Sequence, residues 1–261
     1  MTSLTTSNES LDDLNRRIQA YLRAHALRAA DHEQCSVFLA SFDAEDDNPY
    51  RNYAVPDDGA APRAGDIAAL ISAFVRRQRK PRLEYIAKAA PKVEAALIAR
   101  GFAVEKRYPI LICTPGRVQS LRPPQGVNLL LAISEEMIVG AAQALAEAYG
   151  QDNAHAAPLI RMVAQGGVLV AARDAVSGEV VGAGMATPAH KGTSEVAGIG
   201  VRPAHRSRGI AGALTARITR EAFARNVNLA WLTPGDEAPE RVYVRAGFTR
   251  ASEQLHISLS P

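Results

Sequence analysis

The same helix-to-strand joint occurs twice in this sequence. An Ala-Pro pair opens a helical pattern that ends in Gly-Phe at 90–102, and again at 238–248. In each copy an apolar residue of the next strand, Leu111 or Ile257, follows at the same distance after the Phe. Pro fits the first turn of a helix, and Gly tolerates the left-handed conformation in which many helices end. This joint is also a common one, but the matched spacing favours an internal duplication.

The segment Leu121–Gly126 separates the two copies. Its consecutive prolines exclude a helix or the interior of a sheet, which is typical of a linker. A chain of 261 residues can form one large domain or two smaller ones, so length alone does not decide. The repeat and the linker together predict an N-terminal domain over 1–122 and a C-terminal domain over 126–261.

Hydrophobic periodicity and turn residues predict the elements of each half. In the first half we expect helices at 9–30 and 65–79, the second with Asp66 able to cap it, and a loop at 43–62. In the second half we expect, in order, a strand at 127–133, a helix at 135–149 capped by Ser134, a polar connection to Pro158, strands at 167–173, 180–187 and 194–201, a helix at 209–225, a strand at 228–233, a helix at 239–246 and a strand at 251–259. The pattern is that of an α/β chain with a mixed sheet.

Composition excludes several classes of protein. Hydrophobic residues make up 47% of the chain and charged residues 22%, which is typical of a soluble globular protein. The N-terminus has no apolar signal-peptide core, and no stretch is long and apolar enough to span a membrane, so we expect a cytoplasmic protein with no membrane partner. Cys35 and Cys113 are isolated thiols and are expected to be packing residues. No metal site is expected.

The formal net charge of +3 lies entirely in the first half, which also contains a dense basic run at Arg76–Arg82. Such a run can bind phosphate or nucleic acid, or it can be a solvated helix end stabilised by the helix dipole. Aromatic residues are only 5% of the chain and none interrupts the run, which argues against nucleic-acid binding through base stacking.

The segment from Glu195 to Gly212 predicts an anion site. A strand runs into a turn of glycines and arginines, and this turn opens a long helix. The amides of a helix start are unpaired and the helix dipole makes that end positive, so a diphosphate is favoured there. Gly209 would allow a phosphate to approach the backbone, and Arg206 and Arg208 could add charge-assisted hydrogen bonds. The spacing matches neither the Walker loop nor the dinucleotide fingerprint.

Arg206-Ser-Arg-Gly209-Ile-Ala211 resembles the Gln/Arg-x-x-Gly-x-Gly/Ala signature of the GCN5-related N-acetyltransferase (GNAT) superfamily. The context strengthens this resemblance: Val201-x-Pro203 before the turn, the long helix, the strand at 229–232 and Tyr243-x-x-x-Gly247-Phe248 follow in the family's order.

The resemblance covers 126–261, and the repeat extends a fainter likeness to the first half. It implies two tandem GNAT-like domains, each with a mixed, mostly antiparallel sheet flanked by helices. The first copy lacks the signature before its helix at 66–79, so it should bind coenzyme poorly or not at all.

The resemblance also implies acetyl-CoA as co-substrate and particular roles for residues. The residues implied to bind the coenzyme are Ile199, Gly200, Val201, Arg206, Ser207, Arg208, Gly209, Ile210, Ala211 and Gly212. Glu195 corresponds to a carboxylate that relays a proton from the amine, although it could be only a solvated residue at a strand start. Tyr243 corresponds to an acid that protonates the leaving thiolate, although it could merely pack on its helix.

Three functions therefore remain open. The first is an N-acetyltransferase acting on a primary amine of a small molecule or a protein. The second is a non-catalytic, regulatory module that binds acetyl-CoA, and the third is a nucleic-acid or nucleotide binder that uses the basic run. The sequence leaves open the identity of the amine and whether the protein is a homodimer, because fold does not fix substrate.

Overall fold

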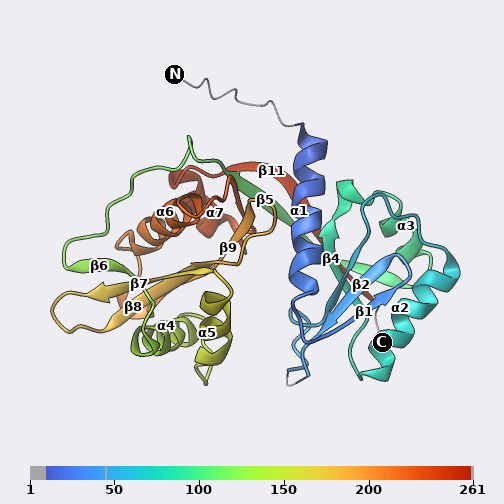
Figure 1. Cartoon of the computed structure of the whole chain (residues 1–261), viewed down its shortest axis with the longest axis horizontal. Helices are drawn as coiled ribbons and strands as arrows, with labels where there is room; N and C mark the ends of the chain where they lie inside the picture. The colour runs from blue at the N-terminus through green and yellow to red at the C-terminus, as the bar shows by residue number, and fades with distance from the viewer. Residues whose placement is uncertain (1–9, 45, 260–261) are drawn as a thin grey trace. The chain divides into compact units, whose positions relative to one another are not determined.

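The computed structural model describes residues 10–44 and 46–259, and its contacts divide the chain into two compact units. Unit 1 comprises Met1–Pro109 and Ala251–Pro261, and unit 2 comprises Ile110–Arg250. Each unit contains a sheet with helices packed on it (Figure 1).

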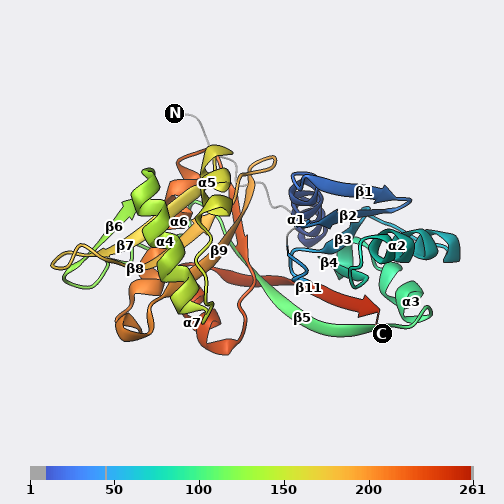
Figure 2. The ribbon, with the colours of Figure 1, turned by 90° about the horizontal axis from the view of Figure 1, so that it is seen from below.

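Unit 2 is built on a sheet in the order β5-β10-β9-β8-β7-β6. Its strands are β6 (Val127–Leu131), β7 (Val168–Asp174), β8 (Val180–Ala186), β9 (Thr193–Val201), β10 (Leu229–Leu232) and the end of β5 (Phe102–Cys113). Neighbouring strands are antiparallel except β9 and β10, which are parallel. Helices α4 (Glu135–Ala148) and α5 (Ala156–Ala164) cover one face, and α6 (Ile210–Phe223) and α7 (Glu237–Arg245) cover the other (Figures 1 and 2).

The alternation of side chains along a strand supplies both faces of this sheet with apolar residues. In β7, Val168 and Val170 pack with the α6 side of the core, whereas Leu169 packs with the α4 side. Both faces are buried, so β7 reads in the sequence as an almost continuous apolar run.

Unit 1 has the strand order β1-β2-β3-β4-β11-β5. Its elements are α1 (Leu11–Ala26), β1 (Asp31–Cys35), β2 (Phe38–Phe42), β3 (Tyr53–Pro56), α2 (Ala64–Arg76), β4 (Arg82–Ile86), a 3-10 turn (Ala87–Ala89), α3 (Val93–Ile98), most of β5 and most of β11 (Thr249–Leu259). The Ser10 side chain caps α1 by accepting a hydrogen bond from the Asp13 amide at 3.1 Å. Every residue of β2 and β3 is buried, which requires cover on both faces of the sheet.

The last strands of the two halves of the sequence do not stay within their own halves: the end of β5 enters the sheet of unit 2, and most of β11 enters the sheet of unit 1. Leu111–Cys113 at the end of β5 pair with β10 in unit 2, and Gln254–Ser258 of β11 pair with β4 in unit 1. The compact units therefore differ from the predicted domains, 1–122 and 126–261. Strand pairing is a non-local contact, and two similar terminal strands carry no sequence signal that says which sheet each one enters.

Most predicted elements of the second half are confirmed with small shifts at their ends, and two regions, one in each half, differ from the prediction. The predicted loop at 43–62 contains β3, which is too short to show a periodic pattern between its turn residues. No helix is predicted between 149 and 167, yet α5 begins inside the predicted polar connection, and its first turn accommodates Pro158. The predicted helix at 9–30 is observed as α1, and residue 9 lies outside the described residues.

The two cysteines are buried and free, as expected of packing residues. Burial raises the pKa of both thiols, Cys35 and Cys113, to about 11. Over the described part of the chain, no helix has both the length and the apolar character needed to cross a membrane.

The glycines of the repeated joint provide a test of its geometry. Gly101 and Gly247 both have positive φ, +87° and +106°. A Cβ on Gly247 would lie 2.1 Å from the carbonyl oxygen of Arg117, whereas a Cβ on Gly101 would meet only Leu259 at 3.5 Å. Gly101→Ala should therefore cost about 1–2 kcal/mol, the price of the left-handed backbone alone, and Gly247→Ala clearly more.

Urea denaturation of both variants measures this difference. Trp231, the chain's one tryptophan, is buried in unit 2, so its fluorescence follows the unfolding of the Gly247→Ala variant. Circular dichroism follows the unfolding of the Gly101→Ala variant. Equal losses of unfolding free energy in the two variants would contradict the close approach at Gly247.

Candidate functional site

The turn between β9 and α6 leaves a row of backbone amides unpaired. Gly209 is the N-cap of α6 in a left-handed conformation, with φ of +84°, and no side chain caps the helix. The first hydrogen bond of the helix runs from the Ala213 amide to the Gly209 carbonyl, at 3.2 Å. Among the described residues, the amides of 207–212 have no hydrogen-bond partner. Together with the helix dipole they form a site suited to an anion.

These amides border a cavity of about 560 Å³. Seven of the predicted coenzyme-binding residues line it: Val201, Arg206, Ser207, Gly209, Ile210, Ala211 and Gly212. The other lining residues are His205, three residues of the segment before β6 (Ser120, Leu121 and Arg122) and two of α7 (Val242 and Arg245). The lining contains three arginines and no carboxylate. Its charge therefore favours an anionic ligand.

Arg206 lies in this lining, but two of its donors are already used. Its Nε donates to the carbonyl of Val201 at 3.2 Å, and one terminal nitrogen donates to the carbonyl of Ala148 at 2.7 Å. The side chain thus joins the end of β9 to the C-terminal end of α4. Its positive charge remains beside the cavity, while the free amides supply most of the available donors. The neighbouring Arg208 contacts the ring of His205 at 3.1 Å.

The strand that leads into the turn separates from its parallel neighbour. β10 pairs with β9 only along Thr193–Glu195, so within the described residues 196–201 have no β10 partner. The register with β8 shifts near Gly198, which has φ of +58°. The Tyr149 hydroxyl donates to the carbonyl of Ile199 at 3.1 Å, and Gly200 packs closely on α4. Ile199 and Gly200 thus belong to the free edge of β9, outside the cavity lining.

Tyr243 and Tyr149 are close enough to influence each other. Tyr243 lies on α7 and is partly buried. Burial raises the pKa of Tyr243 to about 12, with smaller contributions from Tyr149 and Asp236. Burial also raises the pKa of Tyr149. Both phenols therefore stay protonated well above neutral pH. Sequence reasoning missed Tyr149, because in the sequence it marks only the end of a helix.

Glu195, the predicted proton relay, lies outside the cavity lining. It pairs with Trp231 across the parallel strands, and its amide donates to the Thr187 hydroxyl at 3.2 Å. Its side chain is partly buried. The proposed role of Glu195 remains a prediction.

The start of α2 in unit 1 carries opposite charge from the start of α6. The Asp66 carboxylate accepts hydrogen bonds from the Arg63 amide at 2.7 Å and from the Ser36 hydroxyl at 2.6 Å. These bonds lower the pKa of Asp66 and keep it ionised. A carboxylate at this helix end disfavours a second anion there. This agrees with the expectation that the first copy binds coenzyme poorly.

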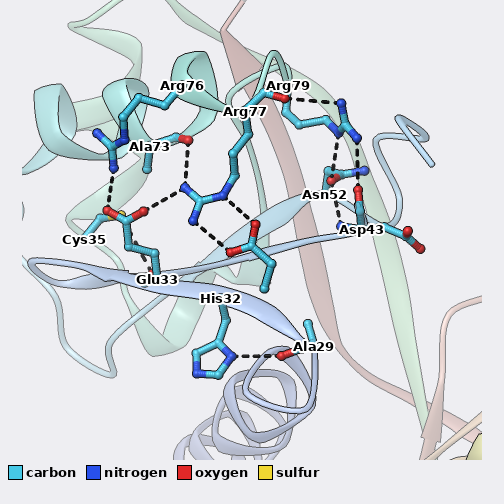
Figure 3. A network of polar contacts seen from close by, with 11 residues as sticks. Ala29, His32, Glu33, Cys35, Asp43, Asn52, Ala73, Arg76, Arg77 and Arg79 are labelled. Atoms are coloured by element: carbon cyan, nitrogen blue, oxygen red, sulfur yellow. Dashed lines mark hydrogen bonds and ion pairs between the residues drawn. The ribbon is translucent and has the colours of Figure 1, made fainter. Parts of the chain in front are cut away.

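The basic run of unit 1 is largely neutralised by nearby acids (Figure 3). Arg77 makes a bidentate pair with Asp31 and also contacts Glu33, each at 2.7–2.8 Å. The other pairs are Arg76 with Glu33, Lys80 with Glu105, and Arg82 with Glu84 and Glu105; Arg79 donates to Asn52 and to the carbonyl of Asp43. The basic run therefore forms ion pairs and hydrogen bonds within unit 1, which weakens the physical basis for a nucleic-acid site.

Comparison with known proteins identifies the family. Residues 129–248 match the sequence model of the acetyltransferase (GNAT) family. This part of the chain is a GNAT acetyltransferase domain. The match includes β9, the Gly209 turn, α6 and Tyr243, so the family assignment and the unpaired amides concern the same segment. No curated protein sequence matches the chain.

Solved GNAT structures share the fold over most of the chain. A GCN5-related N-acetyltransferase from Kribbella flavida is 25% identical and has a TM-score of 0.81, with 95% of this chain and 96% of that chain covered. One from Sphaerobacter thermophilus is 17% identical, with a TM-score of 0.61 over 86% of this chain and 78% of that one. A tandem GNAT protein from the clavulanic acid biosynthesis pathway is 14% identical, with a TM-score of 0.61 over 86% of this chain and 80% of that one. The predicted fold class is confirmed.

Proposed function

We propose that unit 2 binds acetyl-CoA at the Gly209 turn and transfers the acetyl group to a primary amine of a small molecule or a protein. The observation that carries this proposal is the row of unpaired amides at 207–212, which borders a cavity lined by arginines and no carboxylate. The family's general use of acetyl-CoA supports it. The diphosphate of the coenzyme would accept hydrogen bonds from these amides.

The chemistry is direct attack within a ternary complex. The nitrogen lone pair of a neutral amine forms a bond to the thioester carbonyl carbon, and the carbon–sulfur bond then breaks. Unpaired backbone donors along β9 beyond Glu195 would stabilise the oxyanion that forms in between. A proton leaves the amine nitrogen, for which Glu195 is the candidate acceptor. Another proton must reach the coenzyme sulfur.

Tyr243 is the candidate donor of that last proton. Burial keeps its phenol protonated, with a pKa of about 12. A thiolate that develops in the transition state can accept a proton from such a group. Tyr149, which lies near Tyr243 and donates to the Ile199 carbonyl, would position the surrounding backbone.

An isosteric pair of variants at Gly209 tests coenzyme binding. Asn and Asp tolerate a left-handed N-cap better than other residues with side chains, and no atom lies within 4 Å of a Cβ there. Gly209→Asp places a negative charge among the free amides, and Gly209→Asn does not. Like charges at ~4 Å near a protein surface repel by about 4 kcal/mol before screening by salt. We expect Gly209→Asp to bind acetyl-CoA at least about tenfold more weakly than Gly209→Asn in calorimetry. Equal affinities would place the diphosphate elsewhere.

Tyr243→Phe tests catalysis separately from binding. A panel of small amines and peptides is screened for release of the coenzyme thiol, and the best acceptor is used. Loss of a general acid should lower turnover by about 10²-fold or more, with acetyl-CoA affinity retained. In the parent protein, the Tyr243 phenol has a pKa of about 12, so turnover should fall through loss of its proton only as the pH rises toward 12, and not near 10.

Unchanged turnover in Tyr243→Phe would remove Tyr243 as the acid. Tight acetyl-CoA binding without turnover of any amine in the panel would contradict the enzyme and favour the non-catalytic regulatory module.

A further inference from the structure

The segment that joins the two halves of the sequence packs against the start of α6 and the end of α7. The Gln119 amide donates to the carbonyl of Ala246 at 3.0 Å, and Arg220 donates to the Ser120 hydroxyl at 3.2 Å. A Cβ on Gly212 would meet the Leu121 side chain at 3.3 Å. These contacts lie immediately before Arg122 in the chain. They place this arginine in the lining of the cavity beside the free amides.

Arg122 and Arg245 stand out among the arginines of unit 2. Most others are occupied: Arg202 pairs with Glu147 and Glu179, and Arg250 pairs with Glu240. The side chains of Arg122 and Arg245 have no hydrogen-bond or ion-pair partner among the described residues, and both residues are exposed. They come from different elements, the joining segment and α7, yet line the same cavity.

The chemistry of the coenzyme provides two separate anionic groups for this cavity. One is the diphosphate, which the amides at 207–212 would take in the proposed function. The other is the phosphate on the 3′ oxygen of the adenosine ribose. Arg206 already donates two hydrogen bonds to backbone carbonyls, so it is less suited to bind the 3′-phosphate. A guanidinium with all its donors free can bind a phosphate through paired hydrogen bonds.

We propose that Arg122 and Arg245 together bind the 3′-phosphate of the coenzyme, and that the joining segment thereby forms part of the coenzyme site. The apolar side chains of Leu121, Ile210 and Val242 line the same cavity and would contact the adenine ring. This inference rests on the proposed binding of acetyl-CoA. It adds a specificity: the protein distinguishes acetyl-CoA from its 3′-dephospho form.

Calorimetric titration with acetyl-CoA and with 3′-dephospho-acetyl-CoA tests this subsite. The parent is compared with the double variant Arg122→Gln/Arg245→Gln. Arg241→Gln is the matched control, because Arg241 is an exposed arginine of the same helix α7 that does not line the cavity. Both substituted residues are exposed, and a thermal midpoint equal to that of the parent verifies folding of the double variant.

The parent and Arg241→Gln should bind acetyl-CoA about tenfold or more tightly than the dephospho form, the factor expected for one charge-assisted contact. The double variant should bind both ligands alike, with the affinity for the dephospho form unchanged. Equal binding of the two ligands by the parent, or equal weakening of both in the double variant, would overturn the subsite while leaving the Gly209 turn intact. Binding of neither ligand by the parent would instead overturn the proposed function itself, and this inference with it.

Discussion

The left-handed conformation of Gly209 lets β9 enter α6 without a capping side chain, and this leaves the first amides of the helix available to a ligand. A capping carboxylate at this position would satisfy the same amides and fill the site with negative charge. Unit 1 differs in charge: Asp66, in the first turn of α2, accepts a hydrogen bond from the Arg63 amide and places a carboxylate at that helix end. The starts of α2 and α6 therefore carry opposite charge, and of these two only the start of α6 is electrostatically suited to an anion.

Each sheet contains strands from both halves of the sequence, because the end of β5 enters the sheet of unit 2 and β11 enters the sheet of unit 1. β10 needs the end of β5 at its outer edge, and β4 needs β11. In unit 1 the exchanged strand also brings His256 to Arg82, whose guanidinium lies 2.8 Å from the ring nitrogen and is almost fully buried. Burial and the neighbouring Arg82 lower the pKa of His256 to about 3, so this histidine stays neutral. The C-terminal strand is thus held in unit 1 by backbone pairing and by a buried polar network.

Local signals in the sequence were sufficient for features that depend on local geometry. Gly101 and Gly247 have the positive φ that the repeated joint predicted, and Ser134 caps α4. The Gly209 turn also follows from residues close together in the chain. Features that depend on distant contacts were missed or misplaced. Tyr149 gains its place near Tyr243 only through folding, and the sequence could not show which sheet β11 enters.

The most direct measurement of the central claim is an amide-resolved NMR titration of the ¹⁵N-labelled protein with acetyl-CoA. The largest shifts should fall on the amides of 207–212, which have no partner in the described structure, while those at the start of α2, 64–67, should not move. Shifts that spare 207–212, or that appear at α2 instead, would contradict the assignment of the Gly209 turn as the coenzyme site.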